Sequence, residues 1–350
     1  MFLEKRQRCL CHIFINIVNT LSIMARNKKT SESLFQFMNL LIALLLKNGQ
    51  LRTMQHYKTT LNSYMRFRNN KDITFKEIDA EELQSYEAYL KNVARVCANT
   101  SSFYLRILRA TYNKAVEKGL ISTPQQSPFK NVYTGIAKTK KRAIPTAAVS
   151  SIKHLNTIND ANGANKLSSK QELARDAFLM SFYLRGISFI DLAHLRKSDL
   201  KDGFITYTRS KTGQRLSIRW EKDMQDIVDK YQAETASSPY LFPFLANSDT
   251  QRKNKTTPNN RQDELRLYHN AESRITYHLK KLGAKMGIQG KLTLYVARHS
   301  WATVARDNDV SVSVISQALG HNSEATTQIY LRSIQTSEVD DANAKILTAI

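Results

Sequence analysis

The first part of the chain carries apolar residues three and four positions apart, a spacing that aligns them on one face of an α-helix. In one such stretch, Leu83, Tyr86, Leu90 and Val93 share the face that should be buried. Four consecutive helices are predicted, at residues 33–47, around 57–67, at 80–96 and at 100–119. Residues 31–122 are therefore expected to form a small helical bundle with a basic outer surface.

A mixed pattern begins at residue 146. Two short runs in which apolar and polar residues alternate, 203–208 and 215–219, predict an antiparallel β-hairpin with Lys211 at its tip. Helical spacing surrounds this hairpin, at residues 146–155, 170–185, 189–196, 263–286, 295–308, 313–319, 324–332 and 338–349. The expected fold class is mainly α with a small antiparallel β-sheet, in which an α+β domain follows an N-terminal helical bundle.

Prolines and a run of basic residues separate the two patterns. Pro124 and Pro128 interrupt the helical spacing. Four cations then precede Pro145, namely Lys138, Lys140, Lys141 and Arg142. The expected organisation is a disordered extension at residues 1–30, a helical domain at 31–122, a basic linker at 123–145 and a second domain at 146–350. Translation from Met24 instead of Met1 stays open.

The overall composition permits a folded core and excludes several classes of protein. Of 350 residues 42% are hydrophobic, Gly (11) and Pro (6) are too few for a collagen-like chain, and no fixed-period repeat occurs. Three cysteines, Cys9, Cys11 and Cys97, provide no disulfide framework, which favours a reducing, cytoplasmic location. The segment from Cys9 to His12 lacks the second ligand pair of a structural zinc site, so neither a metal nor another cofactor is expected.

The charge balance indicates a polyanionic partner. The chain has 52 Lys+Arg against 30 Asp+Glu, a net charge of +22, and neutralising phosphates would account for such an excess. Double-stranded DNA is the first candidate, and an anionic membrane surface is the alternative. The longest apolar stretch, residues 34–46, falls short of the roughly 20 residues needed to span a bilayer, so no membrane partner is expected.

The most informative motifs lie near the C-terminus. Arg298 stands in the run Tyr295-Val-Ala-Arg-His, a Leu-Gly-His turn ends at His321, and Tyr330 follows nine residues after that histidine. In these motifs and their order the sequence resembles the tyrosine recombinase (phage integrase) family of the simple two-domain type, over about residues 31–350. The resemblance implies that Arg298 and His321 belong to the catalytic set and that Tyr330 is the nucleophile.

The same residues suit the chemistry of a phosphodiester. Its negative charge repels nucleophiles, so phosphoryl transfer needs cationic donors around the non-bridging oxygens. The planar guanidinium of Arg298 matches two phosphate oxygens and stays protonated. Tyr330 can attack phosphorus and form a phosphotyrosine that preserves the bond energy for rejoining, without ATP or a metal.

Further members of the catalytic set follow from the resemblance. Lys211 occupies the position of the family's catalytic lysine, which implies that it protonates the departing 5′ oxygen as general acid. Ser188 stands where the family's first arginine is expected, and Arg185, about one helical turn earlier, is predicted to take that role. Tyr295 replaces the usual histidine; its hydroxyl can donate a hydrogen bond to phosphate but cannot act as an imidazole base. His299 is expected to be structural.

The resemblance also implies how DNA is bound. The two domains would clamp a duplex, with basic residues of the fourth helix and the linker on the phosphate backbone: Arg106, Arg109, Lys114, Lys138, Lys140, Lys141 and Arg142. A homotetramer on two paired sites would exchange strands through 3′-phosphotyrosyl intermediates. The short stretch before the first helix favours a simple recombinase, such as an invertase, a resolvase-like enzyme or a mobile-element integrase.

Two other functions stay open. A type IB topoisomerase would use the same chemistry to relax supercoils without pairing two sites. A catalytically silent, sequence-specific DNA-binding protein would explain the displaced arginine and Tyr295. The target sequence, any accessory factors and the choice between integration, inversion and excision do not follow from the residues, because base readout depends on the pose of a few side chains in the grooves.

Overall fold

The computed structural model describes residues 33–137, 143–155, 167–245 and 261–331, without the side chains of residues 261–263, 329 and 330. The chain divides into two compact units, Met1–Thr139 and Lys140–Ile350. The predicted extension at 1–30, the predicted helix at 338–349 and the linker cations Lys138, Lys140, Lys141 and Arg142 lie outside the described residues.

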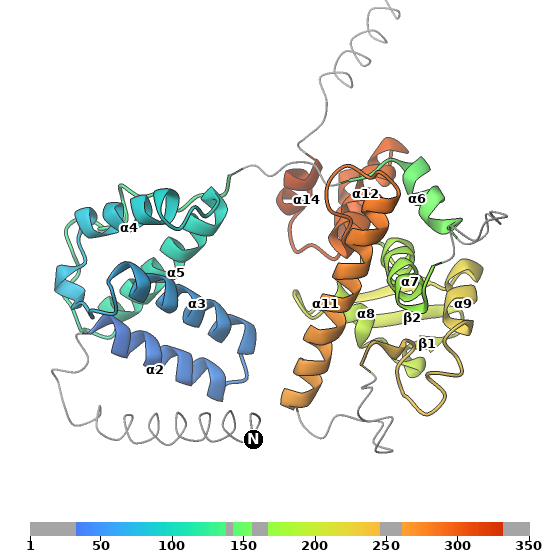
Figure 1. Cartoon of the computed structure of the whole chain (residues 1–350), viewed down its shortest axis with the longest axis horizontal. Helices are drawn as coiled ribbons and strands as arrows, with labels where there is room; N and C mark the ends of the chain where they lie inside the picture. The colour runs from blue at the N-terminus through green and yellow to red at the C-terminus, as the bar shows by residue number, and fades with distance from the viewer. Residues whose placement is uncertain (1–32, 138–142, 156–166, 246–260, 332–350) are drawn as a thin grey trace, which may run out of the picture. The chain divides into compact units, whose positions relative to one another are not determined.

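The first unit is a helical bundle built around buried aromatic rings. Two of its helices begin at side-chain caps, because Ser33 accepts from the backbone N–H of Gln36 and Asp79 from that of Glu82. Tyr64 and Tyr86 are fully buried, with ring centroids 4.8 Å apart. The elements are α2 (Leu34–Lys47), α3 (Leu51–Phe67), the short 3-10 helix η2 (Phe75–Glu77), α4 (Ala80–Asn92) and α5 (Ala98–Glu117) (Figure 1).

Helix α4 ends earlier than its apolar spacing predicts, and the burial expected for Val93 is wrong. The helix stops at Asn92, and Val93 is 69% exposed, whereas Leu90 is fully buried. Arg95 adopts a left-handed φ of 50°, and the N–H of Val96 bonds to the carbonyl of Leu90 at 3.0 Å. The chain therefore turns away from the bundle before Val93 can complete the apolar face.

Part of the segment expected to be a linker packs on the first unit. Phe129 and Val132 are buried in its core. The side chain of Asn99 on α5 exchanges two hydrogen bonds with the backbone of Ala137, at 3.0 and 2.8 Å. Ser102 donates to the carbonyl of Gly135 at 2.5 Å. The helical unit thus extends beyond residue 122, to Ala137.

The second unit combines helices with a small antiparallel sheet in the strand order β1-β2-β3. The predicted fold class, mainly α with a small antiparallel β-sheet, is confirmed; β1 and α9 are not among the predicted elements. The elements are α6 (Thr146–Lys153), α7 (Ser169–Tyr183), α8 (Phe189–Ala193), η3 (Lys197–Asp199), β1 (Leu200–Lys201), β2 (Phe204–Thr208), β3 (Arg215–Arg219), α9 (Lys222–Asp229), η4 (Pro243–Leu245), α11 (Arg261–Lys285), α12 (Leu294–Asp307), α13 (Val312–Ala318) and α14 (Glu324–Leu331).

Helix α7 runs through the interior of the second unit and contacts α6, α9, α11 and α12. Residues 174–181 are all buried, including Arg175 and Asp176, whose charges are paired at 2.7 Å. Lys230 and the hydroxyl of Tyr231 also bond to Asp176, at 3.2 and 3.0 Å. This buried network ties α7 to the chain that follows α9.

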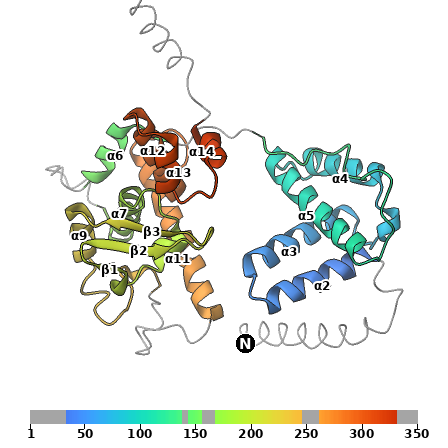
Figure 2. The same cartoon turned by 180° about the vertical axis from the view of Figure 1, so that it is seen from behind.

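The C-terminal helices α12, α13 and α14 gather at the end of the second unit opposite β1 in both views (Figures 1 and 2). They share a small core of their own that includes Ala302, Ile315, Leu319 and Leu331. Strands β2 and β3 pair in register from Phe204↔Arg219 to Thr208↔Arg215. Within the described ranges of the chain, no helix is long and apolar enough to cross a membrane.

Candidate active site

Arg298 lies on α12 and is buried, with 6% of its surface exposed. One terminal nitrogen, Nη1, donates to the carbonyl of Gly186 at 2.8 Å. The other, Nη2, donates to the carbonyl of Leu319 at 2.6 Å and lies 3.0 Å from Nε2 of His321. The structure thus brings together the predicted site residues Arg298 and His321, which are 23 positions apart in the sequence.

The contact between Arg298 and Gly186 requires a glycine. Gly186 has φ 75°, and a Cβ atom there would lie 2.5 Å from Cγ of Arg298 and 2.7 Å from its Cα. Both distances are far below the roughly 3.5–4.0 Å separation of carbon atoms in contact. The left-handed backbone and the approach of α12 therefore both exclude a side chain at this position.

Arg185 precedes this glycine and has a φ of 57°, a conformation that costs an arginine about 1–2 kcal/mol. Two backbone hydrogen bonds end α7 here. The N–H of Arg185 donates to the carbonyl of Phe182 at 3.1 Å, and the N–H of Gly186 donates to the carbonyl of Ser181 at 2.7 Å. A non-glycine residue held in this region is often associated with a functional site. Arg185 therefore lies at the C-terminal end of α7, next to the residue that packs on Arg298.

The positive charges of the site converge on Tyr207 of β2. Burial, followed by the charge of Asp191, raises the pKa of the Tyr207 hydroxyl, and Arg298, Arg209 and Arg185 act in the opposite direction. All three guanidinium groups therefore lie within electrostatic reach of one tyrosine. Arg185 joins the cluster although Ser188 holds the position expected for the first arginine.

His321 occupies the turn after α13. Gly320 has φ 64°, and the N–H of His321 bonds to the carbonyl of Ser316 at 3.0 Å, an arrangement typical of a glycine that ends a helix. Burial, and then the charges of Arg298, Arg209 and Lys211, lower the pKa of His321 to about 4. The imidazole is therefore neutral at pH 7.

The hydrogen bonds of His321 define which nitrogen carries its proton. A guanidinium has only donors, so Nε2 must accept from Arg298. The proton then lies on Nδ1, which donates to Oγ1 of Thr327 at 2.7 Å. Thr327 is fully buried on α14, three residues before Tyr330 and hence about one turn away. His321 thus connects Arg298 with the helix that carries Tyr330, whose own side chain is outside the described residues.

Lys211 is exposed in the loop between β2 and β3, residues 209–214. The loop is closed by hydrogen bonds from Arg209 N–H to the Gln214 carbonyl and from Gly213 N–H to the Arg209 carbonyl, both 2.8 Å. Thr212, the next residue, donates to the carbonyl of Gly320 at 3.3 Å, so the loop lies beside the Leu-Gly-His turn, and the charge of Lys211 contributes to the lowered pKa of His321.

Arg209 belongs to the same cluster, although no motif of the sequence contains it. It is only 7% exposed, and its Nη1 donates to the carbonyl of Gly320. The signal that would have found it is the alternation along β2, because Ile205, Tyr207 and Arg209 share the face that turns inward.

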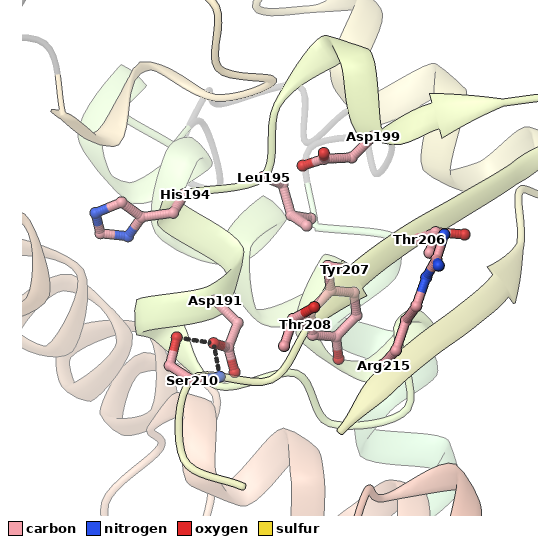
Figure 3. Close-up of a pocket in the computed structure, with 9 residues that line it drawn as sticks. All are labelled: Asp191, His194, Leu195, Asp199, Thr206, Tyr207, Thr208, Ser210 and Arg215. Carbon is pink, nitrogen blue, oxygen red and sulfur yellow. Dashed lines mark hydrogen bonds between the residues drawn. The ribbon is translucent and has the colours of Figure 1, made fainter. Parts of the chain in front are cut away.

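A buried carboxylate holds the other side of the loop. Asp191 on α8 accepts from the backbone N–H and the hydroxyl of Ser210, at 2.9 and 2.5 Å, as Figure 3 shows. It also accepts from Ser188 at 2.6 Å, so Ser188 supports this carboxylate. A cavity of about 370 Å³ opens beside Asp191 and Ser210 and is also lined by Thr206 and Arg215 (Figure 3).

Tyr295 lies on α12, about one turn before Arg298, and is 43% exposed. Its ring packs edge-on against His299, with centroids 4.5 Å apart. Tyr295 and Arg298 thus lie on the same helix. His299, also on α12, packs its ring against that of Tyr295.

The residues predicted to bind the DNA backbone fall into different environments. On α5, Lys114 is exposed and Arg106 is half-buried. Arg109 is also half-buried, and its Nη1 donates to the hydroxyl of Thr134 at 3.0 Å. Among the described residues, no group of three or more His, Cys, Asp or Glu side chains is arranged to hold a metal ion.

Comparisons with known proteins agree with this arrangement of the chain. The family model for the phage integrase SAM-like domain matches residues 33–132, and that for the phage integrase family matches residues 152–336. Tyrosine recombinase XerA of Pyrococcus furiosus is 30% identical over 47% of this chain and 51% of that protein, so this match spans about half of the relative. Tyrosine recombinase XerC of Leptospira interrogans is 22% identical over 81% of this chain and 84% of that protein. Among solved structures, a lambda integrase tetramer bound to a Holliday junction has the same fold, with a TM-score of 0.56 and 16% identity over 85% of this chain and 77% of that chain.

Proposed function

Because the chain belongs to the phage integrase family, that of the tyrosine recombinases, we propose that it cuts and rejoins duplex DNA at specific sites through a 3′-phosphotyrosyl intermediate on Tyr330. The substrate is a DNA phosphodiester, and the net charge of +22 supports a polyanionic partner of this kind. The two alternatives, a topoisomerase-like relaxing enzyme and a silent DNA-binding protein, are outcomes of the test below.

One set of contacts carries the proposal. The imidazole of His321 accepts from Arg298 at 3.0 Å and donates to Thr327, one turn from Tyr330, at 2.7 Å. A cation that can bind a phosphate oxygen is thereby linked to the helix of the proposed nucleophile. A DNA-binding protein without chemistry would have no need for this connection.

In the proposed reaction, Arg298 and Arg185 bind the non-bridging oxygens of the scissile phosphate. The phenol oxygen of Tyr330 forms a bond to phosphorus, and the bond from phosphorus to the 5′ oxygen breaks. Lys211 gives a proton to the departing 5′ oxygen. When Arg298 turns its Nη2 donor from Nε2 of His321 to the phosphate, this nitrogen of the neutral imidazole is free to take the phenol proton. Tyr295 on α12 supplies a hydroxyl for a further hydrogen bond to the phosphate.

The assembly proposed for this reaction is four protomers on two paired DNA sites, which exchange strands pairwise. The fold match to a lambda integrase described as a tetramer on a Holliday junction supports it. We place the helical unit on the DNA backbone through Lys114 and Arg106, with Lys138, Lys140, Lys141 and Arg142 following in the chain. A simple recombinase that performs integration, inversion or excision fits this organisation.

Covalent capture tests the proposal. The protein is mixed with fragmented genomic DNA of its source, denatured, and the DNA that stays attached is recovered and sequenced, with Tyr330→Phe in parallel. Adducts that are absent with Tyr330→Phe and converge on one sequence are the expected result. Adducts without a common sequence would instead support topoisomerase-like relaxation. Tight, salt-sensitive DNA binding without any adduct would support the silent DNA-binding protein.

A further inference from the structure

Arg209 is a buried cation at the base of the loop that carries Lys211. It follows the last residue of β2, and its backbone N–H and carbonyl both take part in closing the loop, through Gln214 and Gly213. Arg209 is only 7% exposed, whereas Lys211 is an exposed residue of the same loop. A buried arginine lowers the stability of the fold unless its donors form hydrogen bonds, so the partners of Arg209 indicate its role.

The contacts of Arg209 are with the turn that carries His321. Its Nη1 donates to the carbonyl of Gly320, and the hydroxyl of Thr212 donates to the same carbonyl at 3.3 Å. A Cβ atom on Gly320 would lie 3.1 Å from Cδ of Arg209 and 3.2 Å from Cδ1 of Leu216. The hairpin is therefore packed directly on the backbone between Leu319 and His321.

The loop is held from its other side as well. Ser210, between Arg209 and Lys211, donates two hydrogen bonds to Asp191 on α8. The residues that flank Lys211 are thus attached at two places, Ser210 to α8 and Thr212 to the Gly320 carbonyl. Lys211 itself is exposed, so the loop positions the backbone of the lysine while its ammonium group stays available.

We infer that Arg209 is a positioning residue that docks the loop of Lys211 on the Leu319–His321 turn, so that the general acid and the phosphate-binding groups are held in one arrangement. This inference rests on the proposed function, because it assigns Arg209 a part in the protonation of the 5′ oxygen. The loss expected without Arg209 is specific: the phosphate still binds, and proton transfer to the leaving group becomes slow.

The electrostatics are consistent with this geometry. Arg209 and Lys211 both lower the pKa of His321, after burial and Arg298, so their charges lie near the same imidazole. Arg209 is bonded to a carbonyl oxygen and keeps its charge close to His321 without accepting or donating a proton, because a guanidinium does not deprotonate in proteins.

A change of leaving group separates this role from a general loss of structure. In the normal substrate the bond from phosphorus to oxygen breaks, and the 5′ oxygen takes a proton from Lys211. When sulfur replaces the bridging 5′ oxygen, the bond from phosphorus to sulfur breaks and the thiolate leaves without a proton, because a thiol is far more acidic than an alcohol. The sulfur substrate therefore makes the reaction independent of the general acid.

The test uses the full chain and a duplex bearing the site recovered by covalent capture, with either oxygen or sulfur at the scissile 5′ position. Arg209→Gln should form the Tyr330 adduct at least about 10-fold more slowly than wild type on the oxygen substrate, and Lys211→Ala about 100-fold more slowly. On the sulfur substrate both should return to within about threefold of wild type. The double variant should be no slower than Lys211→Ala, since both changes remove the same proton transfer.

Two further variants keep the inference falsifiable. Arg219→Gln removes a charge from an exposed side chain of the same hairpin and should cleave both substrates like wild type. Thr212→Val removes the second donor to the Gly320 carbonyl without touching a buried cation, and should show a smaller loss with the same recovery on sulfur. This variant serves if Arg209→Gln fails to fold.

The outcomes distinguish the inference from the function on which it rests. Equal losses by Arg209→Gln on the oxygen and sulfur substrates, or by Thr212→Val where Arg209→Gln does not fold, would overturn the positioning role alone. Normal cleavage by Arg209→Gln would do the same. Absence of any adduct with wild type would overturn the proposed function, and the inference with it.

Discussion

Substitution of Gly186 by alanine should disable the site by moving α12. The new methyl group would lie 2.5 Å from Cγ of Arg298 and 2.7 Å from its Cα, about 1 Å closer than carbon atoms in contact allow. Because one of these atoms is backbone, rotation of the arginine side chain cannot relieve the overlap. We expect the substitution to lower the free energy of unfolding by about 2–5 kcal/mol. Of this loss, about 1–2 kcal/mol comes from alanine in the left-handed conformation and about 1–3 kcal/mol from overpacking. A displacement of about 1 Å at Arg298 should slow formation of the Tyr330 adduct roughly 100-fold.

The chain contains a matched control for this substitution. Gly203, in the turn between β1 and β2, has the same φ of 75°, but a Cβ atom there would meet nothing within 4 Å. Gly203→Ala should therefore lose only the backbone part, about 1–2 kcal/mol, and keep the wild-type rate of adduct formation. Urea denaturation of both variants measures the first quantity, and single-turnover cleavage of the captured DNA site measures the second. If Gly186→Ala matches Gly203→Ala in both measurements, the close packing of Gly186 on Arg298 affects neither the free energy of unfolding nor the rate of adduct formation, and the prediction is wrong.

Three further predictions follow from neighbouring contacts. Arg185→Ala should slow adduct formation at least about 100-fold, whereas Ser188→Ala should stay within about 10-fold of wild type; near-normal cleavage by Arg185→Ala would exclude its assignment to the phosphate. Because the pKa of His321 is lowered from 6.5 to about 4, the unfolded chain takes up this proton first. The stability difference between wild type and His321→Gln should therefore be constant above pH 6.5 and change, to the disadvantage of wild type, as the pH falls toward 4 in urea titrations; a pH-independent difference would contradict the neutral imidazole. Asp176→Asn should lower the free energy of unfolding by about 3–5 kcal/mol in the same assay, because the cations of the buried network lose their carboxylate, and a loss below 1 kcal/mol would show that solvent reaches it.

Most of the elements could be predicted because their causes are local. Helix α14 begins at the predicted Glu324, and β3 has the predicted bounds 215–219, since caps and alternation are written in neighbouring residues. The end of α4 could not be predicted, because apolar spacing continues to Val93 while the chain turns away after Asn92. For the same reason, the burial of Phe129 and Val132 could not be predicted. They follow prolines in the sequence, but they are buried against helices that precede them.

The site divides in the same way. Arg298 and His321 could be selected from the sequence because each stands in a short motif on which the family resemblance rests, although Arg298 bonds to Gly186, 112 residues away. The roles of Asp191 and Arg209 could not be predicted, because they arise from contacts between the hairpin and distant segments. Alternation along β2 places Arg209 on the inward face, but its partner Gly320 is 111 residues away. Arg185 is an intermediate case: its proximity to the expected position was visible, but its reach depends on the left-handed turn that ends α7.

The partners of the buried arginines separate a structural cation from a functional one. Arg175 is 4% exposed and is paired with Asp176 at 2.7 Å and Glu172 at 3.3 Å, so carboxylates cancel its charge and leave little field for a ligand. Arg298 and Arg209 are as deeply buried, but the partners shown above are the carbonyl oxygens of Gly186, Leu319 and Gly320 and a neutral imidazole.

Carbonyl dipoles solvate a cation without cancelling its charge, as the Gly320 carbonyl does for Arg209. Arg298 and Arg209 both lower the pKa of His321, after burial. An anion that binds here would offset the same charges and raise the pKa of His321 toward its ordinary value. Binding of a phosphodiester should therefore make the imidazole a better proton acceptor at the moment when the phenol of Tyr330 must lose its proton.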